Sequence, residues 1–121
     1  MSTEVFVYGT LKPGQHRWPI LAPFAVEPGA GVPASAPGRL FDTGYGWPAA
    51  VFDPRGADRV PGVVVGLHPA STDEALAVLD DVEGVDSGLF RRLLIDVEGR
   101  PCWAYHWPGA TGGFRRITLW Q

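Results

Sequence analysis

The sequence has a single cysteine, no long apolar run and no excess of positive charge, and each absence excludes a class of protein. Cys102 stands alone among 121 residues, so no disulfide can form within the chain, which is typical of a reducing cytoplasm. No apolar run approaches the length of a membrane span, and the N-terminal residues lack the basic and apolar regions of a signal peptide. The formal net charge of −3 leaves no basic footprint. We therefore expect a cytoplasmic protein that binds neither nucleic acid nor membranes.

The motifs of the common metal and cofactor sites are also missing. The three histidines, His16, His68 and His106, are scattered, and none has the spacing of a metal-ligand pair. Neither a P-loop nor a dinucleotide-binding fingerprint is present. Cys102 lies in a predicted strand, where a buried structural thiol is favoured over a nucleophile. We expect no metal and no organic cofactor.

Turn-forming residues are abundant instead. Glycine (16) and proline (12) make up almost a quarter of the 121 residues, yet five tryptophans and six phenylalanines are available for a core. This composition predicts many short strands separated by turns. The length is that of one domain, which would span residues 1–121.

The pattern along the chain predicts two helices and several short strands. The first helix, 15–21, is limited to about one turn by its proline. The second, 71–84, begins with a capping-box pair, Ser71 and Glu74, and ends at Gly84, where a left-handed glycine is common. Because helices do not alternate with strands, the pattern predicts an α+β domain or a small, partly closed barrel rather than a doubly wound parallel sheet. The predicted strands are 4–8, 24–26, 38–41, 49–52, 60–67, 90–97, 101–107 and 117–120.

The first predicted strand runs into a loop with the sequence V-F-V-Y-G-T-L-K-P-G, residues 5–14. Gly9 removes the side chain where the chain turns, so that backbone N–H groups can face a ligand. Pro13 and Gly14 close the segment with turn chemistry. Such a short motif by itself favours a strand followed by an ordinary tight turn. The alternative is a loop that receives an anion or a carbonyl oxygen.

Glu83 is the charged residue that the helical pattern directs toward the core. On a wheel at about 100° per residue it falls roughly 20° from Leu76, inside the apolar face, whereas Asp80 lies at the edge of that face. Burial, the negative end of the helix and repulsion from Asp80 would each raise the pKa of the Glu83 carboxyl. A carboxyl that titrates near neutrality can take a proton and return it, as a general acid/base does. The alternative is a frayed helix end, with Glu83 in water or paired with Arg91 or Arg92.

These two features occur in the order of two motifs of one family, Y-G-T-L at 8–11 and L-D-D-V-E-G at 79–84. In these motifs, and over nearly its whole length, the chain resembles the γ-glutamylcyclotransferase-like family, which includes γ-glutamylamine cyclotransferases and the plant AIG2-like proteins. The resemblance implies a small mixed β-barrel with short flanking helices. Further agreement lies in G-R-L-F at 38–41, P-A at 48–49, V-P-G-V at 60–63, F-R-R at 90–92 and A-Y at 104–105.

The resemblance also implies the roles of the site residues. Glu83 would be the catalytic acid/base, and backbone N–H groups of the Y-G-T-L loop would bind the glutamyl part of the substrate. The family often has tyrosine where this chain has Phe90, so any hydrogen bond from that hydroxyl is lost here. The expected substrate-binding residues are Tyr8, Gly9, Thr10 and Leu11, and those expected to line the pocket are Tyr45, Trp47, Phe90 and Tyr105, with Trp103 as an alternative to Tyr105.

The implied reaction is the cyclisation of a small γ-glutamyl compound. The α-amine attacks its own γ-carbonyl, 5-oxoproline forms, and an amine or amino acid leaves, with no metal or organic cofactor. Two other functions stay open on the residues: a non-catalytic small-molecule or protein-binding domain on the same barrel, and a different hydrolase or lyase that uses the same carboxylate. Release of 5-oxoproline from γ-glutamyl compounds distinguishes the three, and the leaving amine and the oligomeric state are left open.

Overall fold

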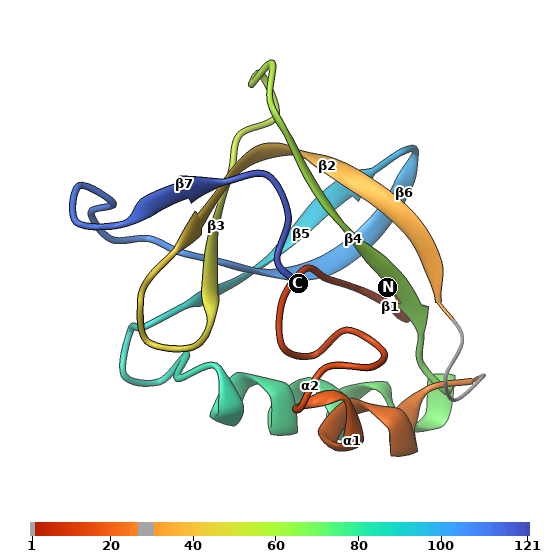
Figure 1. The fold of residues 1–121 in the computed structure, drawn as a ribbon. Coiled ribbons are helices and arrows are strands. Elements are labelled where there is room, and N and C mark those ends of the chain that lie inside the picture. Colours follow the sequence, from red (N-terminus) through yellow and green to blue (C-terminus); the bar gives the residue numbers. More distant parts are fainter. Residues whose placement is uncertain (1, 27–30) are drawn as a thin grey trace.

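The fold is a curled sheet with two short α-helices at one end, seen in a computed structural model that describes residues 2–26 and 31–121 (Figure 1). The seven strands of the described residues follow the order β3-β2-β4-β1-β6-β5, and β7 pairs with β2. All neighbours are antiparallel except β1 and β6, so the sheet is mixed. The elements are β1 (Glu4–Val7), α1 (Trp18–Leu21), the 3₁₀ helix η1 (Ala22–Phe24), β2 (Val32–Asp42), β3 (Pro48–Phe52), β4 (Arg59–Gly66), the 3₁₀ helix η2 (Pro69–Ser71), α2 (Thr72–Val82), β5 (Arg91–Val97), β6 (Arg100–His106) and β7 (Arg115–Ile117).

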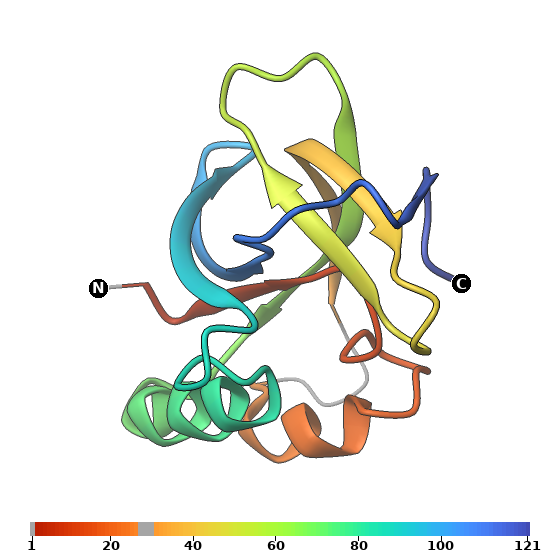
Figure 2. The same ribbon diagram turned by 90° about the vertical axis from the view of Figure 1, so that its left-hand side faces the viewer.

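The curl of the sheet brings the end of β6 against β3. The N–H of Trp107 donates to the carbonyl oxygen of Ala50 at 2.8 Å, and the N–H of Phe52 donates to Nδ1 of His106 at 3.1 Å. The sheet is therefore a half-barrel, and Figure 2 shows α1 and α2 side by side beneath it. The predicted α+β class, a mixed barrel-like sheet with short helices, is confirmed. None of the helices in the described ranges is long and apolar enough to cross a membrane.

Strand β1 is buried on both faces, as the alternation in V-F-V-Y predicts. Val5 and Val7 belong to a core that also contains Leu79 of α2. Phe6 and Tyr8 belong to a second core, which fills the inside of the curl. The strand therefore runs through the centre of the molecule, and its end delivers the Y-G-T-L loop to a place fixed by packing on two sides.

Strand β2 is much longer than the predicted strand 38–41. Its first half was not predicted because it contains two prolines, which are unusual in a paired strand. That half pairs with β4, and the rest pairs with β3 and β7. Pro33, Ser35 and Pro37 are alternate residues of the strand, so their backbone nitrogens point to the same side. The N–H of Ser35 points away from β4 and donates to Glu98 Oε2. The prolines therefore stand where the ladder with β4 needs no donor, so the missing N–H is tolerated.

Three other local predictions are wrong or displaced. Residues 24–26 form no strand: the chain there leaves η1, and Ala25 makes a single bridge to Leu67. The last strand lies two residues earlier than 117–120. Ser71 makes no capping hydrogen bond through its side chain, because it closes η2 and α2 continues directly from that turn.

Candidate active site

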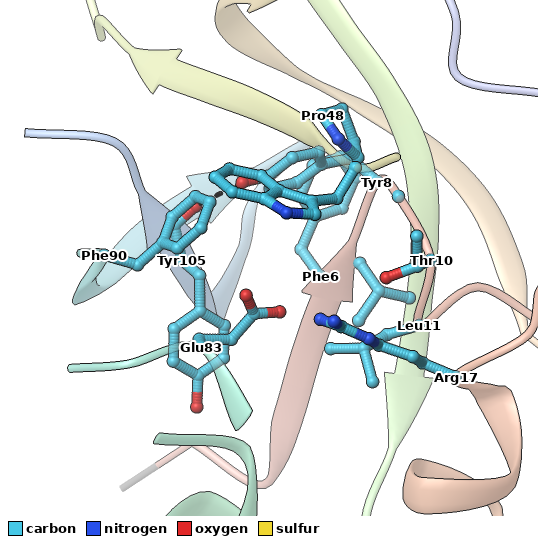
Figure 3. Close-up of a pocket in the computed structure, with 12 residues that line it drawn as sticks. Phe6, Tyr8, Thr10, Leu11, Arg17, Pro48, Glu83, Phe90 and Tyr105 are labelled. Carbon is cyan, nitrogen blue, oxygen red and sulfur yellow. Dashed lines mark hydrogen bonds between the residues drawn. The ribbon is translucent and has the colours of Figure 1, made fainter. Parts of the chain in front are cut away.

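A pocket opens between the loop that follows β1 and the end of α2 (Figure 3). Together with the open solvent at its mouth, the empty space of the pocket is about 370 Å³. The residues predicted for the site line it, except Tyr45 and the alternative Trp103, although they come from five separate parts of the chain. The lining consists of Phe6, Val7, Tyr8, Gly9, Thr10, Leu11, Arg17, Trp47, Pro48, Glu83, Phe90 and Tyr105.

The loop after β1 brings bare backbone against this pocket. A Cβ at Gly9 would lie 2.5 Å from Cγ of Pro48, so only glycine lets the loop approach β3 this closely. The carbonyls of Gly9 and Thr10 accept hydrogen bonds from the N–H groups of Lys12 (3.1 Å) and Arg17 (2.9 Å), which fold the loop back on itself. Across the described ranges, no hydrogen bond uses the N–H groups of residues 9–11. These donors are available to a ligand.

The side chain of Tyr8 is occupied inside the protein. Its hydroxyl donates to the carbonyl oxygen of Tyr105 at 2.7 Å and accepts from the N–H of Ala50 at 3.4 Å. Burial, followed by the nearby charge of Glu83, raises the pKa of the Tyr8 hydroxyl well above its ordinary value. The hydroxyl therefore stays protonated and connects the end of β1 to β6 and β3. Tyr8 can then contact a substrate through its backbone rather than through its hydroxyl.

Glu83 is held at the pocket by the way α2 ends. Its N–H donates to the carbonyl of Leu79 at 2.9 Å, and Gly84 follows in the left-handed conformation with φ of 65°. The N–H groups of Gly84 and Val85 donate to the carbonyls of Asp81 and Asp80, which completes a Schellman motif. The helix end is closed rather than frayed, and the carboxylate faces the pocket (Figure 3).

The environment of Glu83 brings its acidity to the range that proton transfer needs. Burial raises the pKa of the carboxyl from 4.5 to about 7, and the positive charge of Arg17 opposes part of that rise. Among the ion pairs of the described residues, none joins the two side chains. A carboxyl in this state exchanges protons readily near neutral pH.

Asp80 does not act on Glu83 as predicted. It accepts a hydrogen bond from the hydroxyl of Tyr105 at 2.8 Å and lies 3.0 Å from Nε of Arg92, at an angle that makes an ion pair rather than an aligned hydrogen bond. Repulsion from Asp80 is thus absent from the causes of the raised pKa of Glu83. The predicted alternative that Glu83 pairs with Arg92 is wrong, because Arg92 pairs with Asp80 and covers the ring of Trp103 at 4.7 Å.

Aromatic rings form one wall of the pocket. Trp47 and Phe90 contact each other with ring centroids 5.6 Å apart, and Trp107 lies behind both. The prediction that Tyr45 also lines the pocket is wrong: its side chain is 75% exposed and stacks on the outer side of Trp47 with centroids 6.0 Å apart. Trp103 does not line it either. This wall is apolar, and Phe90 adds no hydroxyl to it.

Arg17 is the charged lining residue that the sequence analysis did not predict. It has no motif around it, and it reaches the pocket because the loop folds back and bonds its N–H to Thr10. Figure 3 shows its guanidinium directed toward the carboxylate of Glu83 across the pocket. In the described part of the chain, no three His, Cys, Asp or Glu side chains gather as metal ligands do.

Comparisons with known proteins agree on one family and one fold. Over residues 5–119 the sequence matches the family described as gamma-glutamyl cyclotransferase, AIG2-like. A solved AIG2-like protein from Mus musculus is 18% identical with a TM-score of 0.67, covering 98% of this chain and 88% of that one. A structure described as gamma-glutamyl cyclotransferase is 21% identical with a TM-score of 0.63, covering 96% and 70%. An uncharacterized protein from Pyrococcus horikoshii is 18% identical with a TM-score of 0.66, covering 97% and 86%. No curated protein gave a significant match. At these identities the solved structures show the shared fold.

Proposed function

Because the chain belongs to the gamma-glutamyl cyclotransferase, AIG2-like family, we propose that it converts a small γ-glutamyl compound into 5-oxoproline and a free amine or amino acid, with Glu83 as general acid/base. One observation carries the proposal: a single pocket is lined by Glu83 and by residues 9–11, whose N–H groups donate no hydrogen bond within the described residues. A base and a set of fixed N–H donors are the two components that acyl transfer from a γ-carbonyl needs.

The N–H groups of residues 9–11 would hold the negative oxygen atoms of the substrate. They can receive the carboxylate of the glutamyl group or the oxyanion that develops on the γ-carbonyl. Such donors are effective because they are already oriented by the fold before the substrate arrives. Packing of β1 on both faces and the contact of Gly9 with Pro48 supply that orientation.

Glu83 would move the protons. The anionic carboxylate takes a proton from the α-ammonium, and the freed amine attacks the γ-carbonyl carbon to form the new C–N bond. Glu83 then returns a proton to the leaving nitrogen as the old C–N bond breaks. Over the whole reaction two protons pass from the attacking to the leaving nitrogen, giving a neutral lactam and an ammonium group. Because both reacting groups belong to one folded substrate, orientation contributes much of the rate.

The test is a panel of γ-glutamyl amines and γ-glutamyl amino acids, each assayed for 5-oxoproline. We expect wild-type protein to release it from at least one of them, and Glu83→Gln to lower kcat by about 10²- to 10⁴-fold, the usual contribution of general acid/base catalysis. Glu74→Gln is the matched control, because it removes an exposed carboxylate from the same helix.

Two results would contradict the proposal. Full activity in Glu83→Gln would remove Glu83 from the mechanism. Absence of 5-oxoproline from every compound, together with binding of γ-glutamyl compounds at residues 8–11, would instead support a non-catalytic binding domain on the same barrel.

A further inference from the structure

The pocket contains two opposite charges that do not neutralise each other. Arg17 and Glu83 both line it, their side chains point toward one another, and no ion pair among the described residues joins them (Figure 3). Neither the hydrogen bonds nor the ion pairs of the described chain use the guanidinium of Arg17. The space between the two side chains can therefore receive a ligand that carries both charges.

We propose that Arg17 binds the α-carboxylate of the γ-glutamyl group and so selects substrates in which that carboxylate is free. This inference rests on the proposed function, which places the α-ammonium at Glu83. Ammonium and carboxylate are attached to the same α-carbon, so a group held by its ammonium at Glu83 can extend its carboxylate away from Glu83 into the space beside it. Arg17 lies across that space. A guanidinium fits a carboxylate through two parallel hydrogen bonds.

The remaining lining agrees with this placement. Tyr8 and Tyr105 use their hydroxyls within the protein and so do not offer them to a carboxylate, and Arg17 is the cation among the described lining residues. The wall formed by Trp47 and Phe90 is apolar and suits the leaving group rather than a carboxylate. With the α-carboxylate on Arg17, the N–H groups of residues 9–11 are left for the oxyanion of the γ-carbonyl.

Arg17 is open to substitution because its structural contacts are made by its backbone. Its N–H donates to Thr10, and its carbonyl accepts from the N–H of Ile20, and both bonds survive any change of side chain. Loss of function in a variant therefore reports on the guanidinium rather than on the loop.

The experiment measures binding of 5-oxo-L-proline and of 5-oxo-L-prolinamide, which lacks the carboxylate, by titration calorimetry. We expect wild type to prefer the acid, and Arg17→Gln to lose about 10- to 100-fold in affinity for the acid while binding the amide unchanged. Arg17→Lys keeps the positive charge but cannot form two parallel hydrogen bonds, so its affinity for the acid should lie between those of wild type and Arg17→Gln. It also keeps the test valid if the glutamine variant does not fold. Arg55→Gln removes an exposed arginine from a turn outside the pocket and should behave as wild type.

Turnover separates this inference from the proposed function. At a pH above the acid limbs of both proteins, we expect Arg17→Gln to raise KM for γ-glutamyl amines more than it lowers kcat. An α-carboxamide analogue should be processed equally there by wild type and variant. An unchanged preference for the acid in both Arg17 variants would overturn the assignment while leaving the cyclisation intact. So would an effect confined to γ-glutamyl amino acids, since Arg17 would then bind the carboxylate of the leaving group. Conversely, an Arg17-dependent preference for the acid, without any 5-oxoproline formed, would contradict the proposed reaction alone.

Discussion

Burial of Glu83 should make the protein less stable as the pH rises, and Glu83→Gln should remove that loss. The carboxyl titrates at 4.5 in an unfolded chain and at about 7 in the folded one. Below the lower value it is protonated in both states and has no effect. Between the two values the unfolded chain releases its proton first, so rising pH favours unfolding. Above about 7 both states are ionised, and the full loss of stability remains.

The magnitude follows from the two pKa values. A difference of one pKa unit corresponds to about 1.4 kcal/mol, so the difference between 4.5 and about 7 corresponds to about 3 kcal/mol. Glutamine has nearly the same shape and does not titrate. The free energy of unfolding of Glu83→Gln should therefore gain about 3 kcal/mol relative to wild type between about pH 4 and pH 8, or on the order of 10 °C in Tm.

Urea unfolding of both proteins at a series of pH values measures this difference directly. All other titrating groups are common to the two chains, so their contributions cancel. Glu74→Gln, which removes an exposed carboxylate from α2, controls for the loss of one negative charge. Stability curves for wild type and Glu83→Gln that stay parallel throughout would refute the claim that folding desolvates this carboxyl.

Four further changes test the site. The kcat/KM for 5-oxoproline release should fall below about pH 7 in a pH–rate profile, because Glu83 must be anionic to accept the first proton. Arg17→Gln should move that acid limb to higher pH, because the positive charge that lowers the pKa of Glu83 is gone. Gly9→Ala should lower both activity and thermal stability, the latter by about 1–3 kcal/mol, since its Cβ would stand 2.5 Å from Pro48. Tyr8→Phe should cost about 1–3 kcal/mol in chemical denaturation, because two buried backbone groups lose the hydroxyl that pairs with them.

Elements whose residues alternate or repeat regularly could be predicted from the sequence. β1, β4 and the β5–β6 hairpin lie where side-chain alternation and turn residues place them, within one or two residues. The first half of β2 could not be predicted, because a strand tolerates Pro33 and Pro37 only if their nitrogens point away from β4, and the sequence does not show which side faces β4. The start of α2 agrees with the prediction within one residue, but the capping bond predicted for Ser71 is absent, because the preceding 3₁₀ turn continues directly into the helix.

The same distinction holds for the candidate site. Glu83 is identifiable because a helical wheel places it among apolar residues, and a wheel needs no knowledge of distant contacts. Arg17 is not, because its direction depends on how the loop folds back and bonds to Thr10. Tyr45 belongs to an aromatic loop, but Trp47, two residues further along, occupies the pocket wall and leaves Tyr45 outside.

One physical cause underlies both the proposed chemistry and the expected loss of stability. An exposed carboxyl would titrate near 4.5 and would be a weak base for an ammonium proton, so the pocket must desolvate Glu83 to be useful. The more the pocket desolvates Glu83, the lower is the free energy of unfolding of the protein in which Glu83 is ionised and reactive. Arg17 limits this conflict, since its charge favours the anion without removing the carboxylate from the pocket. A substrate carboxylate bound to Arg17 would weaken that help and raise the pKa of Glu83 just as the substrate ammonium arrives. Neutralising Arg17 would thus oppose the lowering of the Glu83 pKa that the ammonium itself causes, so that the carboxylate keeps its strength as a base at the step that uses it.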